Sequence, residues 1–482
     1  MTEAKGITTP TTSEIDFFLN PKTVAVVGAT NNPVKFGHFL LLNLLDLGFK
    51  GKVYPVNLKA DEVLGLKAYP RVDLIPDEVE VAAIIVPAAH VPQVIQDCAK
   101  KGVKGVVILS SGFREAGGEG IKREREIVET AKKGGIRVLG PNTTGILNST
   151  NKFTTSFVPL PRLRDGNVAF IAQTGLFAAA AFWWILSAEP FDLSKVIGLG
   201  NKADVDDSEA LEYLAYDKDT KVIAMYMEGV KDGPKFLKAA RQAASRKPVL
   251  ILKSGRTKAG KKASQSHTGA LAVRDEIFEA VCKQTGIIRV KDFEEMMDFV
   301  KAFALQPLPK GNKVAILSMT GAGCVMAADE CENHSLEVAQ FSERTAKYLE
   351  SYLPSWIEVK NPMDTEMLFE SVGPEDCLRI SLGAALEDEN VNAIVGVLPT
   401  SPMFAFDIQK AVSEVREKNP DKPIAFHIIG SKDMVDLWAK RLQGIGIPVY
   451  PSIERCAKAL GVLYKYWFKH SRLQNLNPNR LF

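Results

Sequence analysis

One local pattern occurs three times along this chain of 482 residues: a short run of Val, Ile and Ala, a turn that contains glycine, and a segment long enough for a helix. The three copies are KTVAVVGAT at 22–30, GNVAFIAQTG at 166–175 and GNKVAILSMTGAG at 311–323. Further β-branched runs alternate with helix-length segments after each copy, which is typical of parallel α/β sheets. We therefore expect three α/β domains and not a solenoid of short repeats.

The breaks between these domains are expected where proline and polar turn residues gather. Such stretches occur at 151–166 (NKFTTSFVPLPRLRDG) and 306–311 (QPLPKG). The expected domains are 15–150, 151–306 and 311–468. In the first of them the strands are expected at TVAVVG, KVYPVN, VAAIIVP, GVVILSS and IRVLGP.

Composition excludes several classes of protein. A net charge of +3 gives no basis for binding a polyanion, so we expect no nucleic-acid partner. The six cysteines are scattered without a C-x-x-C, which argues against a metal site or a disulfide framework and indicates a reducing compartment. The N-terminus lacks the apolar core of a signal peptide. The longest apolar run, at 176–186, is shorter than the roughly 20 residues that span a bilayer. We expect a cytoplasmic protein without a membrane partner.

The first glycine turn indicates a nucleotide site. Backbone N–H groups at the start of a helix bind phosphate, which makes Gly28, Ala29 and Thr30 candidate contacts. The segment GATNNPVKFG departs from G-x-G-x-x-G, and Asn57 and Lys59 stand where an NAD enzyme has an acid for the ribose. Lys35 and Lys59 suit additional phosphates, so the phosphorylated ADP of coenzyme A fits better than NAD. A glycine with a merely structural role is the alternative. Loops at the same sheet edge add five candidates: Val86, Pro87, Ser110, Ser111 and Asn142.

Several segments together resemble a known family. They are VVGATNNPVKFG, KGVKGVVILSSGF, LGPNTTGILN, GLGNKADVDDSEALEYL, YMEGV and SHTGALA. They are similar to the α-subunit of ADP-forming acyl-CoA synthetases, the archaeal-type acetyl-CoA synthetases of the succinyl-CoA synthetase superfamily. The resemblance runs from residue 15 to about 468. It implies a Rossmann-like CoA-binding domain followed by two flavodoxin-like domains of the succinyl-CoA synthetase type, of which the first carries a phosphohistidine loop.

His267 lies in SGRTKAGKKASQSHTGALAV (254–273), whose lysines and glycines predict a flexible, basic loop ahead of a helix. Imidazole is a nucleophile near neutral pH, because its unperturbed pKa is about 6.5. The residues alone also allow a helix-capping loop with a solvated basic face. The resemblance implies that His267 becomes phosphorylated. Glu228 closes the run KVIAMYME at the end of a strand, where a carboxylate can accept the other imidazole N–H. The resemblance implies a catalytic glutamate there, and a surface acid in a turn is the alternative.

A phosphorylated histidine needs compensation for its negative charge, which helix N-termini supply. The resemblance implies that two such helices, one from each ligase-type domain, point at the phosphohistidine. The candidate phosphate-binding residues are Gln173, Thr174 and Gly175 at the first helix, and Thr320, Gly321, Ala322 and Gly323 at the second. We expect Cys324, which follows them, to be a packing residue.

The resemblance implies the reversible reaction acyl-CoA + ADP + phosphate ⇌ carboxylate + ATP + CoA, by way of an acyl phosphate and a phosphohistidine. The chain has no Walker motif and nothing similar to an ATP-grasp domain. The resemblance implies that ATP or ADP and Mg²⁺ bind a separate ATP-grasp β-subunit in an α2β2 assembly, while coenzyme A and a small carboxylic acid bind this chain.

Three interpretations stay open. The chain could be a non-catalytic, CoA-binding regulatory protein of the same fold, or an NAD-linked oxidoreductase, or the same enzyme acting on an acid other than acetate. Trp183 and Trp184 could be core residues or could line an acyl pocket of altered size. Asp204, Asp206 and Asp207 lack the spacing of a calcium loop and are expected to shape the site or cap a helix.

Overall fold

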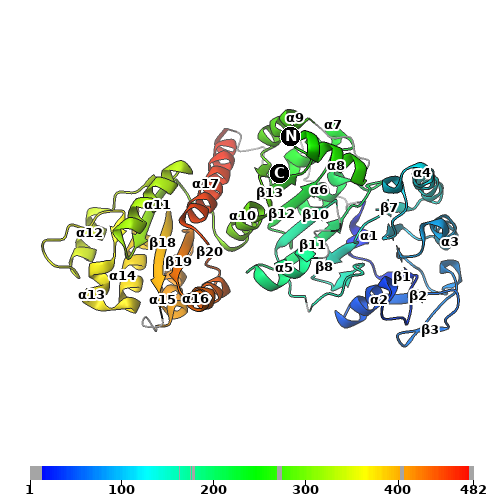
Figure 1. Ribbon diagram of the computed structural model, residues 1–482, viewed down its shortest axis with the longest axis horizontal. Coiled ribbons are helices and arrows are strands. Elements are labelled where there is room, and N and C mark those ends of the chain that lie inside the picture. The colour runs from blue at the N-terminus through cyan, green and yellow to red at the C-terminus, as the bar shows by residue number, and fades with distance from the viewer. Residues whose placement is uncertain are drawn as a thin grey trace, which may run out of the picture. The chain divides into compact units, whose positions relative to one another are not determined.

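A computed structural model of the chain describes residues 14–161, 163–173, 175, 180–268, 274–401 and 406–476 (Figure 1). The chain forms two compact units, residues 1–296 and 297–482. The first unit contains the first and second sheets along the chain, and the second unit contains the third sheet. Within the described residues, no helix is both long and apolar enough to cross a membrane.

The first sheet is parallel throughout, in the order β2-β1-β5-β6-β7. Its strands are β1 (Thr23–Val27), β2 (Lys52–Val56), β5 (Val81–Ile84), β6 (Gly105–Ile108) and β7 (Arg137–Leu139). All five expected strands are present, because small and β-branched residues are buried on both faces, as a sheet covered by helices on both sides requires. The strand order reverses at β1, and in open α/β sheets a ligand binds beyond the strand ends at such a point.

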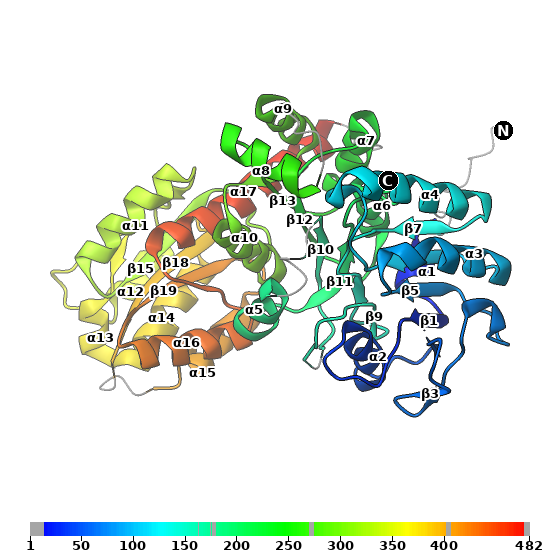
Figure 2. The ribbon, with the colours of Figure 1, turned by 45° about the vertical axis from the view of Figure 1, so that its right-hand side comes forward.

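Helices cover the two faces of this sheet. α3 (Val91–Lys101) and α4 (Gly118–Lys133) lie side by side over one face (Figure 2). On the other face, α1 (Asp16–Leu19) buries Phe18 and Leu19, and α2 (Phe36–Asp46) buries Leu40, Leu41 and Leu44, in a core that continues into the second sheet. Short elements complete the domain: the hairpin β3 (Glu62–Val63) and β4 (Leu66–Lys67), and the turns η1 (Val72–Leu74), η2 (Ala88–His90) and η3 (Arg114–Ala116).

The second sheet has seven strands in the order β14-β13-β12-β10-β11-β8-β9. The parallel strands are β10 (Val168–Ala172), β11 (Leu193–Gly198), β12 (Val222–Met227), β13 (Val249–Lys253) and β14 (Ile288–Val290). β8 (Ile146–Asn148) pairs antiparallel with β11, and β9 (Phe153–Thr154) pairs antiparallel with β8. The second sheet thus begins before residue 151, inside the range expected for the first domain. Proline and polar residues mark the loop after β9 and not the start of the sheet.

The helices of the second sheet are α5 (Ala180–Ala188), α6 (Asp207–Tyr216), α7 (Gly233–Ala244), α8 (Lys258–Thr268) and α9 (Asp275–Thr285). α8 corrects the expectation of a flexible loop before His267. The Thr257 hydroxyl accepts a hydrogen bond from the Gly260 N–H at 3.1 Å and so caps the helix start. Lys and Ala then favour the helix, and the glycine at 260 does not prevent it.

The third sheet is parallel and follows the order β16-β15-β18-β19-β20, with β17 also paired to β15. Its strands are β15 (Lys313–Ser318), β16 (Glu337–Val338), β17 (Met363–Asp364), β18 (Ala393–Thr400), β19 (Ile424–Gly430) and β20 (Val449–Tyr450). α11 (Gly321–Asn333) and α17 (Ile453–Leu476) pack together against it (Figure 1). Its other helices are α12 (Glu343–Glu350), α13 (Glu366–Val372), α14 (Pro374–Glu387), α15 (Ile408–Lys418) and α16 (Lys432–Gly444), and α10 (Phe293–Leu305) crosses the division between the units.

Candidate functional site

The Gly28 turn lies at the point where the order of the first sheet reverses. Gly28 has a φ of +99°, and a Cβ there would stand 2.5 Å from the carbonyl oxygen of Ile85. A second glycine supports the turn: a Cβ at Gly37 would stand 2.0 Å from the carbonyl oxygen of Gly28. This close approach of helix and turn is the role of the last glycine in a dinucleotide fingerprint. The sequence does not reveal this role of Gly37, because the spacing from Gly28 to Gly37 departs from G-x-G-x-x-G.

Asn57 holds the second strand to this turn. Its amide Nδ2 donates to the Ala29 carbonyl oxygen at 2.7 Å, and its Oδ1 accepts from the N–H groups of Lys59 and Ala60 at 2.8 and 3.0 Å. An aspartate at 57 would lack the donor that the Ala29 carbonyl needs. The residue that stands in place of a ribose-binding acid therefore shapes the turn.

The candidate contacts for coenzyme A differ in their exposure to solvent. Lys35, Lys59, Pro87 and Ser111 are exposed, while Gly28, Thr30, Val86, Ser110 and Asn142 are half-buried. Ala29 is fully buried, and its backbone N–H and oxygen are both bonded within the protein, so it shapes the turn and offers a ligand little. The Ser110 hydroxyl donates to the Val86 carbonyl oxygen, and Asn142, at φ +57°, donates its N–H to the Ser110 carbonyl oxygen at 3.0 Å. The loops after β5, β6 and β7 thus form one continuous edge.

Asn201 connects this edge to the second sheet. Its amide Nδ2 donates to Glu115 Oε2 at 2.6 Å and to Glu124 Oε2 at 2.9 Å. Glu115 in turn accepts from the N–H groups of Gly112 and Phe113 in the loop after β6. Asn201 follows Gly200, which has a φ of +55°. A Cβ at residue 200 would clash with the Pro141 carbonyl oxygen, so the chain can pass this close to Pro141 only with a glycine. One side chain after β11 therefore fixes the loop that carries Ser110 and Ser111.

Lys202, the next residue, binds the loops that carry Gln173 and Glu228. Its ammonium donates to Gln173 Oε1 at 3.0 Å, Asp207 Oδ2 at 2.8 Å and the Gly229 carbonyl oxygen at 2.7 Å. Gln173 Oε1 also accepts from the Glu228 N–H at 2.9 Å. Two candidates taken from separate segments are thus adjacent. Of the other residues expected at this helix start, Gly175 is exposed and Thr174 lies outside the described residues.

Glu228 is buried, 4% exposed, directly after β12. Tyr226 lies beside it: burial is the main cause that raises the pKa of the Tyr226 hydroxyl, and the Glu228 carboxylate raises it further. Lys253, at the end of β13, is buried, and this burial lowers its pKa. Glu228 is therefore not the surface acid that the alternative interpretation required. Lys253 and Lys202 were missed from the sequence because lysines at strand ends are usually solvated.

His267 lies in the last turn of α8, and its side chain is outside the described residues. α8 contacts η3, the turn that follows Ser110 and Ser111. The helix that carries the histidine therefore packs on the loop edge proposed for coenzyme A. The contacts that the imidazole makes, and whether either helix N-terminus faces it, stay predictions.

In the second unit, α11 begins at the glycine turn as expected, and the Thr320 hydroxyl caps it by accepting from the Gly323 N–H at 3.1 Å. Gly321 and Ala322 are exposed, and Gly323 is buried against Ser318. Cys324 is buried, 7% exposed, which confirms a packing residue. Burial, with a smaller effect of the Asp364 charge, raises the pKa of its thiol to about 11. The helix N-terminus does not produce a thiolate there.

The acidic cluster after β11 is structural, as expected. Asp206 accepts from the N–H groups of Ser208 and Glu209 and caps α6. Asp204 pairs with both ends of the Arg137 guanidinium at 2.9 and 3.1 Å. Among the residues that the structure describes, no group of three or more His, Cys, Asp or Glu side chains is arranged to hold a metal ion. Trp183 and Trp184 are 43% and 38% exposed, so of the two alternatives for them the structure does not support core packing.

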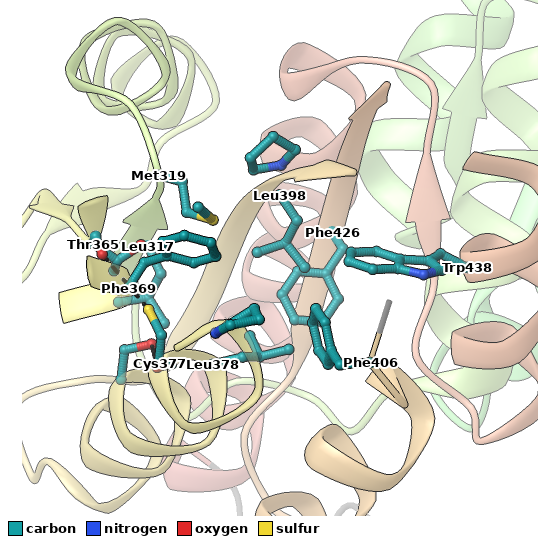
Figure 3. A pocket seen from close by; sticks show the side chains of 13 residues that line it. Leu317, Met319, Thr365, Phe369, Cys377, Leu378, Leu398, Phe406, Phe426 and Trp438 are labelled. Carbon is teal, nitrogen blue, oxygen red and sulfur yellow. Dashed lines mark hydrogen bonds between the residues drawn. The ribbon is translucent and has the colours of Figure 1, made fainter. Parts of the chain in front are cut away.

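A small apolar pocket, partly open to solvent, lies in the third sheet's domain. Figure 3 shows Leu398, Phe426, Phe406 and Trp438 around it, with Met319 and Phe369 on the side of β15. None of the candidate residues from the sequence lines it. Its nearest hydroxyl groups, those of Thr365 and Ser381, donate to the backbone oxygens of Ser318 and Cys377, so the pocket offers a ligand little polar recognition.

The comparisons with known proteins agree with this geometry. Residues 22–149 match the CoA binding domain family, and residues 165–303 match the family described as succinyl-CoA ligase like flavodoxin domain. The chain is 40% identical to the α-subunit of an ADP-forming acetate–CoA ligase II from Pyrococcus furiosus, over 92% of this chain and 96% of that one. It is 43% identical to acetate–CoA ligase [ADP-forming] II from Archaeoglobus fulgidus, but covers 66% of that longer protein and 92% of itself.

A solved structure shares the whole fold. The dinucleotide forming acetyl-coenzyme A synthetase 1 of Ca. Korarchaeum cryptofilum, in complex with phosphate and ADP, superposes with a TM-score of 0.89 at 34% identity, over 96% of this chain and 98% of that one. An α/β chain with a CoA-binding domain followed by a succinyl-CoA ligase-like domain defines the class. The chain belongs to the family of ADP-forming acetate–CoA ligases and corresponds to their α-subunits.

Proposed function

We propose that this chain is the catalytic α-subunit of an NDP-forming acyl-CoA synthetase and that His267 is its phosphoryl carrier. An oxygen of phosphate attacks the thioester carbonyl, which releases the CoA thiol and forms an acyl phosphate. A ring nitrogen of His267 attacks phosphorus, and the carboxylate leaves. The phosphohistidine then transfers its phosphoryl group to ADP. Each step runs in reverse for thioester synthesis.

The observation that carries this proposal is the contact of α8 with η3. It brings the helix of His267 to the loops of Ser110, Ser111 and Asn142, where the thioester end of coenzyme A would bind. Asn201 and Lys202 then connect these loops to Gln173 and Glu228 by hydrogen bonds. Ser110 and Asn142 are thus connected to Gln173 and Glu228 through Asn201 and Lys202 within the first unit.

Individual residues take roles that their chemistry allows. The Glu228 carboxylate would accept the second imidazole N–H and stabilise the charged ring during transfer. Gln173, Thr174 and Gly175 would bind the phosphoryl group at a helix start, and Thr320, Gly321, Ala322 and Gly323 would form a second cradle on the third domain. Lys35 and Lys59 would bind phosphates of coenzyme A near the Gly28 turn.

The chain would act with an ATP-grasp β-subunit in an α2β2 assembly, and that subunit would bind ADP or ATP with Mg²⁺. Two facts support a partner: the relative of matching length is named a subunit, and the match covers only 66% of the longer relative. The acid would be acetate or another small carboxylic acid. The exposed Trp183 and Trp184 are available to line an acyl pocket.

Phosphorylation of the enzyme tests the proposal. The chain, co-expressed with its β-subunit, is incubated with acetyl-CoA and labelled phosphate, and the labelled residue is mapped by mass spectrometry at alkaline pH. Label on His267, lost in His267→Ala while coenzyme A still binds, is the expected result. A regulatory CoA-binding protein would bind coenzyme A and take no label. An NAD-linked oxidoreductase would bind NADH and not coenzyme A. A panel of carboxylic acids in thioester synthesis then identifies the substrate.

A further inference from the structure

Lys202 is a buried lysine whose hydrogen-bonding capacity is fully used. Its side chain is 6% exposed, and its three N–H donors point to Gln173 Oε1, Asp207 Oδ2 and the Gly229 carbonyl oxygen, all within 3.0 Å. An ammonium group has three donors, so none remains for a substrate. Its backbone φ of +54° lies in the left-handed region, which lysine rarely adopts. Lys202 therefore has a strained backbone conformation, and this conformation places its ammonium between three loops.

The second participant is the amide of Gln173. Its Oε1 accepts from both Lys202 Nζ and the Glu228 N–H, at 3.0 and 2.9 Å, which fills the two lone pairs of the oxygen. The opposite orientation of the amide would set an NH₂ group against two donors. The orientation is therefore fixed, with Nε2 on the far side of the amide from Lys202. Gln173 is 3% exposed, so its amide lies in the protein interior.

We propose that Lys202 is a positioning residue that holds the Gln173 amide with its NH₂ toward the transferred phosphoryl group. This inference rests on the proposed function. A buried donor held in a fixed direction stabilises developing charge at no cost of reorganisation. Lys202 would act through Gln173 and would not touch the substrate. Because Glu228 donates its N–H to the same oxygen, the arrangement also places the catalytic carboxylate relative to the donor.

A purely structural role for Lys202 is the competing explanation, since the ammonium also joins the start of α6 to the loop after β12. The two explanations differ in how mutations combine. A positioning residue that acts through Gln173 loses its effect once the Gln173 amide is gone. A structural crosslink destabilises the domain whether or not that amide is present, so its effect adds to that of a second mutation.

The test measures the single-turnover rate of phosphoryl-enzyme formation from acetyl-CoA and labelled phosphate in the complex with the β-subunit. Gln173→Met removes the donor and is expected to slow this step about 100-fold. Lys202→Met frees the amide to rotate and is expected to slow it about 10-fold, with coenzyme A affinity unchanged. The double variant is expected to be no slower than Gln173→Met. The matched control is Lys235→Met, since Lys235 also pairs with the start of α6, through Asp206 and Glu209, and is 39% exposed.

Gln173→Glu keeps the test decisive should Lys202→Met fail to fold. A glutamate still accepts from both donors and pairs with Lys202, but an oxygen replaces the NH₂ and repels phosphate. We expect a loss of at least 100-fold with an unchanged thermal midpoint. Wild-type rates in Gln173→Glu, or multiplied losses in the double variant, overturn the inference. A wild-type complex that takes no label overturns the proposed function instead, so the two failures are distinct.

Discussion

Gly37, in the first turn of α2, packs its Cα against the carbonyl oxygen of Gly28, so closely that a Cβ at residue 37 would stand 2.0 Å from that oxygen. The neighbouring atoms are backbone, which cannot rotate away. The position of α2 and the position of the Gly28 turn are therefore coupled by direct backbone contact.

Gly37→Ala is expected to push α2 away from the turn. Inserting a methyl group into a packed site costs about 1–3 kcal/mol, and here the displaced backbone is part of the binding edge. We expect a lower thermal midpoint and a coenzyme A affinity at least 10-fold weaker, measured by calorimetry. Gly233→Ala is the control, because Gly233 begins α7 with open space around it and should change stability by less than about 0.5 kcal/mol. Equal effects of the two substitutions would contradict the role of Gly37.

Asn57→Asp tests why an amide stands at the end of β2. The aspartate loses the donor to the Ala29 carbonyl and adds a negative charge beside bound phosphates. A lost hydrogen bond with a buried, unsatisfied partner costs about 1–3 kcal/mol. We expect coenzyme A to bind about 10-fold more weakly and NADH binding to stay absent. Asn361→Asp, which breaks amide bonds to Val314 and Ala339 in the other unit, should lower stability without changing coenzyme A affinity. Gain of NADH binding would favour the oxidoreductase.

Glu228→Gln removes the charge and keeps the size of the side chain. If the carboxylate stabilises the imidazolium of His267, phosphoryl-enzyme formation should slow about 100-fold while coenzyme A affinity is retained. Quenched-flow experiments with labelled phosphate measure the rate of phosphoryl-enzyme formation. Glu343→Gln, at an exposed glutamate paired with Lys347, is expected to behave as wild type. An unchanged rate in Glu228→Gln would remove the glutamate from the mechanism.

Thiol reactivity should follow the raised pKa of the buried cysteines. All six are buried, and burial raises the pKa of Cys324 and Cys377 to about 11 and that of Cys282 and Cys331 to about 12. The thiolate is the reactive form, so at pH 8 native protein should react with iodoacetamide far more slowly than urea-unfolded protein, whose thiols titrate near their ordinary pKa of about 8.5. The native rate should rise as the pH approaches 11. A fast-reacting thiol at pH 7 would show that Cys324 is activated by α11.

The sequence predicts the three sheets with their parallel strands and the edge at which Gly28, Ser110 and Asn142 gather, because β-branched runs and glycine turns are local signals. It does not reveal the antiparallel strands β8 and β9 of the second sheet. It predicts Glu228 at a strand end but cannot place it beside Gln173, which is 55 residues away along the chain. The helix at 258–268 is hard to predict, because its lysines and glycine indicate a flexible loop, while the only local signal for a helix start is the Thr257 cap. Lys202 was missed because its role is set by partners from three loops that only tertiary folding brings together.

The antiparallel strand β8 has a consequence for how such chains are assembled and divided. The polypeptide that leaves the first sheet at β7 next forms β8, which lies between β11 and the edge strand β9 of the second sheet, so the two sheets follow each other without a separate linker. A fragment ending at residue 150 would keep β8 without its partner strands β11 and β9. The remainder of the chain would lose the strand that joins β9 to the second sheet. Exchange of cofactor modules between related enzymes, in evolution or by recombination in the laboratory, must therefore carry both sheets together.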